Sequence, residues 1–365
     1  MIDNKSEVFM KALGISCGDF ISVFGNSEEQ LYERLFISDT DISVNIIDES
    51  EIEKNEVSAN FTAFDKLTKM QSLVVYNSIE AFKKRSGIDI NEDIGFASGC
   101  EYGCIKSLAY VNSRINEKGL RGVGVKDAMN CIPCAASSRT AIISGLTGSN
   151  IVNYDGITSS LDSIIFAADR IGLGKNKVFA LAGADEFDPL IENINSSMKE
   201  HKYCEGAASI ILHTLDYKSE CYLSGIGKSF SSEGNYKKAI STAIRKAMSG
   251  DETTYRKIDL VIFGTNGSND INTIFCEALN EIFPEQSMPY LSAEDIFGEV
   301  AGADGILSVI IAMKIFKEQK LALKCKWTAD KIITSEINNI LIADIDISGQ
   351  VSCIIVSNTL KGEKK

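Results

Sequence analysis

Apolar runs alternate with amphipathic stretches along most of the chain. The pattern predicts strands over residues 7–16, 93–98 and 178–183, and helices over residues 28–36 and 159–171. Short apolar runs bounded by glycine are typical of buried strands, whereas a period near 3.6 residues is typical of amphipathic helices. This alternation favours an α/β protein whose sheets are covered by helices.

A weak internal repeat divides the chain. Residues 8–16 and 221–229 each combine a short strand with a glycine turn, which predicts two similar halves, 1–215 and 216–365, packed as one compact unit. The second half is expected to end in a hairpin, because two apolar runs at 340–345 and 351–356 flank a turn at 348–350.

Composition narrows the functional classes. The 365 residues are 44% hydrophobic, enough for one large domain or two fused ones, and the net charge of −13 argues against nucleic acid as a partner. No run approaches the roughly 18 apolar residues of a membrane helix. The first residues do not form a basic, apolar leader, so we expect a soluble, cytoplasmic protein that does not bind membranes.

Ten cysteines in a chain of this length suggest reduced thiols. Two pairs, Cys100 with Cys104 and Cys131 with Cys134, have spacings that a zinc site could use. The residues inside the second pair are isoleucine and proline, in place of the glycine and polar residues usual in a zinc knuckle. We therefore favour free cysteines, mostly buried, and expect no metal.

From residue 145 onward the pattern becomes specific. The segment 145–164 reads GLTGSNIVNYDGITSSLDSI, a glycine turn, a short strand, a second turn and a helix start. It resembles the nucleophile elbow of the β-ketoacyl synthases, in which a strand, a sharp turn bearing cysteine and a helix follow one another. Further family landmarks occur in the same order at 181–186, 205–212, 258–270 and 296–305. The resemblance implies the five-layered αβαβα thiolase fold, built from two fused similar halves.

The resemblance also implies that the catalytic groups have been lost. The nucleophilic cysteine is matched by Ile157, the two histidines by Phe263 and Glu299, and a nearby lysine by Glu294. An alkyl side chain cannot be acylated, and a carboxylate would repel the enolate that histidine donors stabilise. We expect no catalytic residue and no ketosynthase activity of the chain's own.

Histidine content supports this expectation independently. The chain holds two histidines, His201 in a charged loop and His213 at the end of an apolar strand. Both lie outside the matched positions. A ketosynthase triad cannot be assembled from these residues.

Chain-length factors resemble active ketosynthases, lack the cysteine, and carry a similar Leu-Asp step after the elbow, here Leu161 and Asp162. The best-known members have glutamine where this chain has Ile157. We predict a non-catalytic subunit that pairs with an active ketosynthase, as a heterodimer or a dimer of heterodimers, and sets polyketide chain length. The aromatic type is favoured, with an aryl polyene factor as the alternative.

The resemblance places the wall of a substrate tunnel in the segment 99–109 and behind the elbow. Six residues are predicted to line it: Tyr102, Cys104, Ile105, Leu108, Ala109 and Cys134. If the segment is helical, Tyr102, Ile105 and Ala109 share one face. Ordinary core or interface packing is the alternative for the same pattern.

No cofactor of its own is expected for this chain. The acyl carrier protein would present its phosphopantetheine to the partner subunit, because an acidic surface repels an acidic carrier. Two other functions stay open. One is an acyltransferase or hydrolase that uses Cys131, Cys134 or Ser159, although an adjacent general base is missing. The other is a structural homodimer without a ketosynthase.

Overall fold

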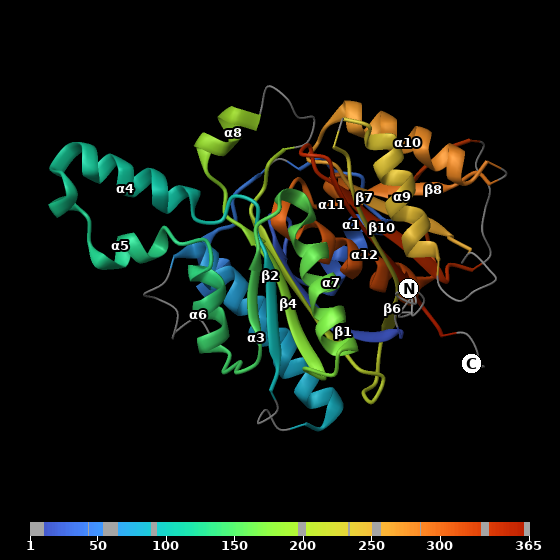
Figure 1. The fold of residues 1–365 in the computed structure, drawn as a ribbon, viewed down its shortest axis with the longest axis horizontal. Coiled ribbons are helices and arrows are strands. Elements are labelled where there is room, and N and C mark those ends of the chain that lie inside the picture. The colour runs from blue at the N-terminus through green and yellow to red at the C-terminus, as the bar shows by residue number, and fades with distance from the viewer. Residues whose placement is uncertain are drawn as a thin grey trace, which may run out of the picture.

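The structure is a computed structural model that describes residues 11–42, 44–53, 65–88, 93–195, 202–232, 234–249, 257–284, 286–329 and 336–360. Helices cover a long central sheet, and one pair of helices extends away from the body (Figure 1). Within the described residues, no helix combines the length and the apolar character that crossing a membrane requires.

The elements of the first half lie between Leu13 and His213. They are β1 (Leu13–Ser22), α1 (Glu28–Phe36), α2 (Glu49–Glu53), α3 (Lys66–Ser86), β2 (Gly95–Gly99), α4 (Ile105–Lys118), η2 (Leu120–Gly122), α5 (Val125–Asn130), α6 (Ala135–Ile143), β3 (Asn150–Asn153), η3 (Gly156–Thr158), α7 (Ser159–Gly172), β4 (Val178–Asp185), α8 (Pro189–Asn195) and β5 (Gly206–His213).

The elements of the second half lie between Cys221 and Ser357. They are β6 (Cys221–Phe230), α9 (Tyr236–Met248), β7 (Leu260–Gly264), α10 (Asn269–Ile282), β8 (Pro289–Ser292), α11 (Ala293–Phe297), η4 (Ala301–Ala303), α12 (Asp304–Glu318), β9 (Lys326–Trp327), β10 (Asn339–Ile345) and β11 (Gln350–Ser357). The predicted terminal hairpin is confirmed, since β10 and β11 pair antiparallel.

The strand order repeats between the halves. In the described part of the chain the sheet runs β3-β2-β4-β5-β1-β6-β11-β10-β7-β8-β9. The first-half order β3-β2-β4-β5-β1 therefore corresponds, strand by strand, to the second-half order β8-β7-β10-β11-β6. The two series meet where β1 pairs antiparallel with β6. The junction at 215/216 that the sequence suggested falls in the connection between β5 and β6.

The first predicted strand, 7–16, is wrong in its bounds. Strand β1 begins at Leu13 and continues to Ser22, and residues 1–10 lie outside the described residues. Its pairing with β5 is irregular between Ser16 and Asp19, where Cys17 has a φ of 56°. This irregularity interrupts the two-residue alternation of buried and exposed side chains along β1. The sequence pattern of the second part of the strand therefore looks like that of a turn.

Local signals define several helices. Helix α1 starts with a capping box, in which the side chains of Ser27 and Gln30 each accept a backbone N–H of the other residue. Helix α3 is capped by the Asp65 carboxylate and ends at Gly87 in the left-handed conformation. These signals are local in the sequence, which explains why the bounds predicted for α1 agree with the structure.

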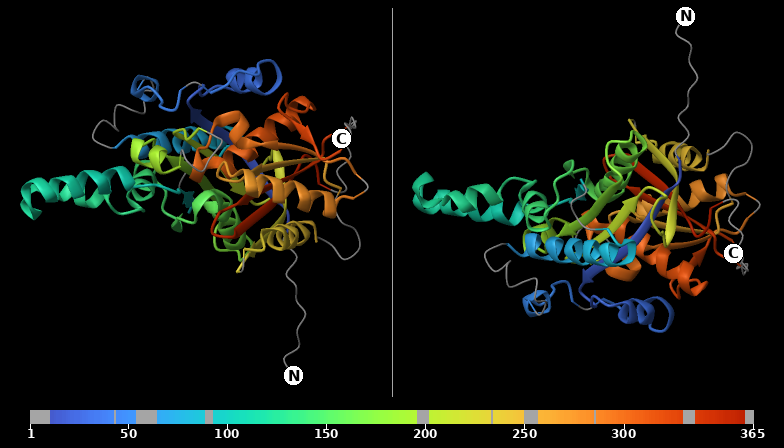
Figure 2. Two further views of the ribbon diagram at one scale, coloured as in Figure 1. Left: turned by 90° about the horizontal axis from the view of Figure 1, so that it is seen from above. Right: turned by 90° about the horizontal axis from the view of Figure 1, so that it is seen from below.

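Five layers result from the packing. Helix α3 covers the outer face of the first-half strands, α9 covers that of the second-half strands, and α7 and α12 lie between these two parts of the sheet (Figures 1 and 2). Alternating strand residues separate the cores: Leu181 and Ile262 belong to the middle core, whereas Ala182 and Phe263 belong to the two outer ones. The predicted αβαβα architecture is confirmed.

One part of the first half projects from these layers. Helices α4 and α5 form an arm that extends well beyond the body in both views (Figures 1 and 2). Neither helix contains a buried residue. Next to the base of the arm, β3 is the edge strand of the sheet and is bonded to β2 alone.

Candidate functional site

The predicted elbow is present in the structure. Strand β3 ends at Asn153, the single turn η3 follows, and α7 begins at Ser159. Gly156 adopts a φ of +69°, and a Cβ at this position would lie 2.1 Å from Oδ2 of Asp346. Only glycine fits this turn, because L residues rarely adopt that φ and no space exists for a side chain.

Ile157 occupies the elbow as a closed, buried side chain. It is fully buried, and its Cδ1 atom would lie 2.8 Å from a Cβ built on Gly264, at the end of β7. The end of β7 is therefore packed directly against the isoleucine. This position offers neither a nucleophile nor space for an acyl group beside it.

The backbone amide at the elbow already has a partner. The N–H of Ile157 donates to Oδ2 of Asp346, at an N–O distance of 3.4 Å. Asp346 lies in the turn between β10 and β11, where its Oδ1 accepts the N–H of Ser348 at 2.7 Å. Condensing chemistry requires donors aimed at a developing oxyanion. Here the N–H of Ile157 already donates to the carboxyl group of Asp346.

Phe263 does not face the elbow. It stacks on Phe275 with ring centroids 4.5 Å apart and packs against Tyr290 at 5.9 Å, in the outer core under α9 and α10. The strand alternation directs its neighbour Ile262 toward the middle core instead. The position that the sequence matched to the first histidine therefore has a packing role.

Asn266 is a site residue that the sequence reasoning missed. It is buried, has a φ of 51°, and its Nδ2 lies 3.3 Å from Oε1 of Glu101 and 3.5 Å from Oδ2 of Asp346. Asparagine tolerates the left-handed conformation, and an Asn-Gly pair marks a turn. The pair formed with Gly267 after a buried strand was the signal that could have identified it.

The two glutamates matched to catalytic positions are both buried. Glu294 accepts the backbone N–H groups of Thr265 at 2.9 Å and Gly267 at 3.1 Å, so its carboxylate shapes the loop after β7. The backbone of Glu299 pairs with Lys202 and Cys204. Glu294, which the sequence analysis matched to a lysine, therefore has a structural task.

Two further carboxyl groups lie in the same buried region. Asp304, the first residue of α12, accepts the N–H of Val300 at 3.2 Å, and Asp344 lies at the end of β10. Burial, followed by the charge of Glu294, raises the pKa of both groups well above the usual range. Both oxygens of Asp344 lack a hydrogen-bond partner among the described residues. Such groups are stable in the neutral, protonated form.

The Leu-Asp step after the elbow connects the two halves. Leu161 is buried in the middle core. Asp162 accepts hydrogen bonds from Lys228 at 2.8 Å, Gln350 at 2.5 Å and Ser352 at 2.6 Å. One carboxylate of α7 thus binds side chains of β6 and β11. The family resemblance singled out Asp162 in the sequence, and the structure shows that this residue links α7 to β6 and β11.

The candidate nucleophile Ser159 and the histidine His213 are both held in structural hydrogen bonds. Ser159 is fully buried. Its Oγ lies within 3.1 Å of the carbonyl oxygens of Gly156 and Cys100, which accept its hydrogen bonds. His213 ends β5, is fully buried and lies 3.1 Å from Oγ of Ser16. His201 lies outside the described residues.

The predicted tunnel wall in residues 99–109, which we call the gate segment, is organised by one buried acid. Asp185, at the end of β4, accepts the N–H groups of Glu101, Tyr102 and Gly103 at 2.9 to 3.0 Å, and that of Gly302 at 2.8 Å. This arrangement binds the loop after β2 to η4. The bound loop continues to Cys104, after which α4 begins at Ile105.

The expected common helix face of Tyr102, Ile105 and Ala109 is wrong, because Tyr102 precedes the helix. Its amide is held by Asp185, and its ring packs edge-on against Tyr203 at 5.2 Å. Ile105 contacts the same small cluster. Ala109 lies on the exposed side of α4, as does Leu108.

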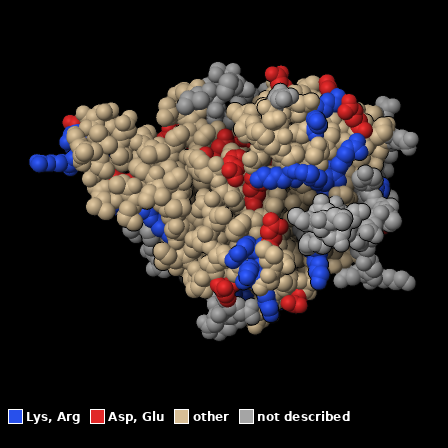
Figure 3. Space-filling model, in the orientation of Figure 1, with Lys and Arg blue, Asp and Glu red and all other residues tan. Residues whose placement is uncertain are grey.

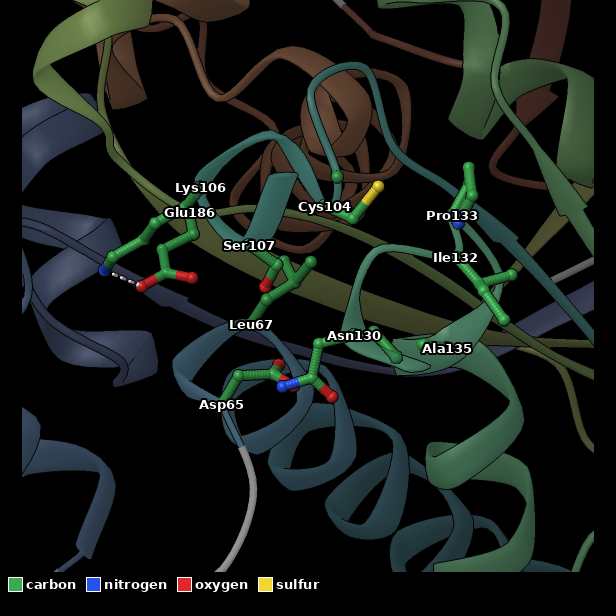
Figure 4. Close-up of a pocket in the computed structure, with 12 residues that line it drawn as sticks. Asp65, Leu67, Cys104, Lys106, Ser107, Asn130, Ile132, Pro133, Ala135 and Glu186 are labelled. Carbon is green, nitrogen blue, oxygen red and sulfur yellow. Dashed lines mark hydrogen bonds and ion pairs between the residues drawn. The ribbon is translucent and has the colours of Figure 1, made fainter. Parts of the chain in front are cut away.

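A pocket that is open to solvent lies at the base of the arm (Figure 4). Its walls come from the starts of α3 and α4 and from the segment that joins α5 to α6. Cys104 and Ser107 line one side, and Lys106 forms an ion pair with Glu186 at the rim. Among the six predicted tunnel residues, Cys104 lines this pocket, whereas Cys134 is exposed.

Three cysteines of this region do not have the environment of an activated thiol. Burial raises the pKa of Cys100, Cys104 and Cys131, which is opposite to the shift that a nucleophile requires. The Sγ of Cys104 donates to the carbonyl oxygen of Cys131 at 3.2 Å. Among the described residues, no three or more His, Cys, Asp or Glu side chains are arranged to hold a metal ion.

Comparison with known proteins finds similar three-dimensional structures but no match by sequence. No protein-family model matches the chain, and no curated protein matches it. The ishigamide ketosynthase/chain length factor is similar with a TM-score of 0.73 and 12% identity, over 95% of this chain and 99% of that chain. A beta-ketoacyl synthase from Burkholderia phymatum STM815 has a TM-score of 0.75 and 14% identity, over 96% and 100%.

A third similar structure is the AntDE:AntF complex, described as a type II PKS acyl-carrier protein with its ketosynthase bound to the hexaketide. It has a TM-score of 0.74 and 13% identity, over 94% of this chain and 98% of that chain. Nearly complete coverage in both directions means that the whole fold is shared. The chain therefore has the thiolase fold of these structures, with Ile157 in the turn before α7.

Proposed function

We propose that the chain is a non-catalytic subunit of the chain-length-factor type that pairs with an active ketosynthase in polyketide assembly. The observation that carries the proposal is the elbow itself. A buried isoleucine stands where a nucleophile would, and its amide is bound by Asp346. The fold around the elbow is otherwise complete, which supports a role as a scaffold without condensing chemistry.

The arm supports pairing with another chain. Leu120 and Val125 are 80% and 79% exposed at its end, and Met129 is also exposed. The adjoining strand β3 presents a free edge. Apolar side chains beside an unpaired edge strand favour association with a second chain. A ketosynthase partner of the same fold could continue the sheet across β3 and bury the arm.

A tunnel shared with that partner gives the subunit its task. The arm carries Leu108 and Ala109 on an exposed helix, and Cys104 lines the pocket at its base. When a partner covers the arm, these side chains would become part of an enclosed wall, and their size would limit the growing chain. We favour an aromatic polyketide as the product, with an aryl polyene as the alternative.

The partner would supply the chemistry in this arrangement. Its cysteine would carry the growing chain, and it would receive the phosphopantetheine of an acyl carrier protein. Among the similar structures, one is described as a ketosynthase/chain length factor and another as a carrier protein in complex with its ketosynthase. The present chain would contribute surface and tunnel wall, and no cofactor of its own.

Co-expression with a ketosynthase tests the proposal. We expect a one-to-one complex that buries more than about 2,000 Å² in total, the scale of obligate interfaces. Size-exclusion chromatography with light scattering measures the stoichiometry, and product analysis with malonyl-loaded carrier protein measures activity. A stable homodimer that ignores every ketosynthase offered would favour the structural alternative and contradict the proposal.

A further inference from the structure

The arm formed by α4 and α5 is joined to the body by two short connections. Residues 100–104 lead from β2 into α4, and residues 131–134 lead from α5 into α6. Neither arm helix contains a buried residue, and the arm stands clear of the body as a narrow projection on the face that Figure 3 shows. The orientation of the arm therefore depends chiefly on the structure of these two connections.

Each connection carries two of the ten cysteines of the chain. Cys100 and Cys104 lie at the two ends of the first connection, and Cys131 and Cys134 lie at the two ends of the second. Both spacings could suit zinc, yet among the described residues no three or more His, Cys, Asp or Glu side chains are arranged to hold a metal ion. Four thiols therefore lie at the base of the arm without a metal to explain them.

The thiol of Cys104 links the two connections. Its Sγ donates to the carbonyl oxygen of Cys131 at 3.2 Å, and Figure 4 shows this sulfur directed toward the segment that carries Pro133. Cys131 follows the last residue of α5, and its own Sγ donates to the carbonyl oxygen of Asp127 at 3.4 Å. The two cysteines thus lie on adjacent segments, as a disulfide requires. Rotation of the Cys131 side chain away from Asp127 is the movement that brings the sulfur atoms together.

Solvent reaches this pair of cysteines. Cys104 lines the pocket at the base of the arm, which is open to solvent, and Cys131 is half-buried. By contrast, Cys221 and Cys353 lie within β6 and β11 and are fully buried. An oxidant in solution therefore reaches the pair at the arm before it reaches the thiols inside the sheet.

We propose that Cys104 and Cys131 form a reversible disulfide that links the two connections and holds the arm in one orientation. Hydrogen peroxide is the oxidant. The Cys131 thiolate attacks one peroxide oxygen, the O–O bond breaks, and the leaving hydroxide takes up the thiol proton to give water and a sulfenic acid. The Cys104 thiolate then attacks the sulfenic sulfur, the S–O bond breaks, and the second hydroxide takes up the Cys104 proton as water. A dithiol reductant, itself oxidised to a disulfide, reverses the reaction.

The disulfide should form slowly and should affect the arm alone. Burial raises the pKa of Cys104 and Cys131, so little thiolate is present at neutral pH, and we expect formation over minutes to hours. Once formed, the bond closes a loop that contains α4 and α5 and so restricts the unfolding of the arm. This inference goes beyond the proposed function, because the bond forms in the isolated chain and requires no ketosynthase.

The test uses the full chain, incubated with hydrogen peroxide or with dithiothreitol and then alkylated with iodoacetamide under denaturing conditions. Digestion with trypsin and a glutamate-specific protease cleaves after Glu101, which leaves Cys104 as the one cysteine of the peptide 102–106. Mass spectrometry of the oxidised sample should show this peptide linked to the peptide 127–139, which contains Cys131. Dithiothreitol should remove the link.

Matched serine variants identify the bonded pair. Cys104→Ser and Cys131→Ser should each abolish the link and keep the native circular dichroism spectrum, since a hydroxyl can donate to the same carbonyl oxygens. Cys100→Ser and Cys134→Ser each remove a neighbouring thiol and should leave the link in place. A link that survives in Cys131→Ser, or a disulfide confined to the peptide 127–139, would overturn the assignment.

Hydrogen exchange measures whether the bond holds the arm. The amides of α5 should exchange at least about threefold more slowly in the oxidised chain than in the reduced chain, because opening at the base of the arm is restricted. The amides of α9, in the other half, should exchange equally in both samples. Equal exchange in α5, or a Cys104 thiol that stays fully alkylable after treatment with peroxide, would contradict the proposal.

Discussion

Ile157 and Asp346 meet across the two halves of the molecule, where the isoleucine N–H donates to the aspartate Oδ2 at 3.4 Å. Ile157 comes from the elbow before α7, and Asp346 comes from the turn between β10 and β11. A helix start with free amides attracts anions. In this protein the anion is part of the chain, so the elbow is closed by its own structure.

Restoring a thiol at the elbow should not restore condensation. In Ile157→Cys the thiol would lie in a buried site, where burial raises its pKa. The groups that stabilise an enolate would still be missing, and each is worth about 3–4 kcal/mol in comparable sites. We expect no product from acyl and malonyl carrier thioesters, measured by mass spectrometry.

A second measurement shows whether that variant is folded and inert. Iodoacetamide should alkylate the thiol introduced by Ile157→Cys more slowly than the thiol of Cys134, which is exposed. Native circular dichroism together with slow alkylation would confirm a buried thiol. Condensation by the single variant at any rate above background would contradict the assignment of a non-catalytic elbow.

The buried aspartates should make stability fall as pH rises. Burial raises the pKa of Asp304 and Asp344 in the folded state well above 3.8, and that of Asp19 to about 6. The folded protein then binds more protons than the unfolded chain, so the free energy of unfolding decreases from about pH 4 upward, through each folded-state pKa. Urea titrations between pH 5 and pH 8 measure the slope.

Asp344→Asn should reduce this slope. The amide has nearly the same size and cannot ionise, so the variant should be more stable than the unaltered protein at pH 8, by at least about 1 kcal/mol, and similar at pH 5. Asp216→Asn changes an exposed carboxyl group and should leave the profile alone. A steeper decline in the Asp344 variant would show that its charged form stabilises the fold.

Charges on the arm should prevent pairing without unfolding the chain. Leu120→Asp with Val125→Asp places carboxylates on side chains that are exposed in the monomer and covered in the proposed complex. We expect the affinity for the ketosynthase to fall at least about tenfold, as for residues at the centre of an interface. The melting temperature of the isolated chain should stay the same.

The control for the arm uses equally apolar positions outside it. Leu173 and Leu215 are also exposed, and Leu173→Asp with Leu215→Asp should leave the complex intact. Isothermal titration or analytical ultracentrifugation compares the two variants. Wild-type affinity in the arm variant would mean that the interface lies elsewhere.

Bulk on the gate segment should shorten the product. Ala109→Phe or Leu108→Trp adds a ring to the exposed side of α4, which the proposed partner would enclose. Packed walls do not yield freely to added volume, and overpacking costs about 1–3 kcal/mol. We expect products shorter by whole two-carbon units in the reconstituted complex, measured by mass spectrometry.

The corresponding control is Lys118→Trp, at the last residue of α4. It should leave product length unchanged because the end of the arm lies away from the pocket that Cys104 lines. Unchanged products from both gate variants, with the complex assembled and active, would move the gate to another segment.

Asp185 should be the most sensitive polar position of the fold. Asp185→Asn replaces a carboxylate that accepts four backbone N–H groups with an amide that accepts at one oxygen. Buried amides then lose their partner, so we expect a loss of about 3 kcal/mol in the free energy of unfolding. Urea unfolding at neutral pH measures it, and a loss below about 1 kcal/mol would show that the loop has other support.

Several elements could be derived from the sequence because their signals are local. Helix α1 has its cap at Ser27, and α7 follows the elbow turn η3, so both matched their expected starts. The β10–β11 hairpin needed only two apolar runs and a turn. Strand β1 was misplaced because its irregular pairing with β5 is a property of the sheet and leaves no two-residue period.

The sequence by itself determined which reactive groups are absent, because residue identity at the elbow and a total of two histidines do not depend on folding. Only the tertiary structure decided what replaced them. Asn266 and Asp346 reach the elbow from positions far along the chain, and strand pairing alone turns Phe263 to the outer core. Such convergence depends on sheet register and layer packing, which a linear pattern of apolar and polar residues does not contain.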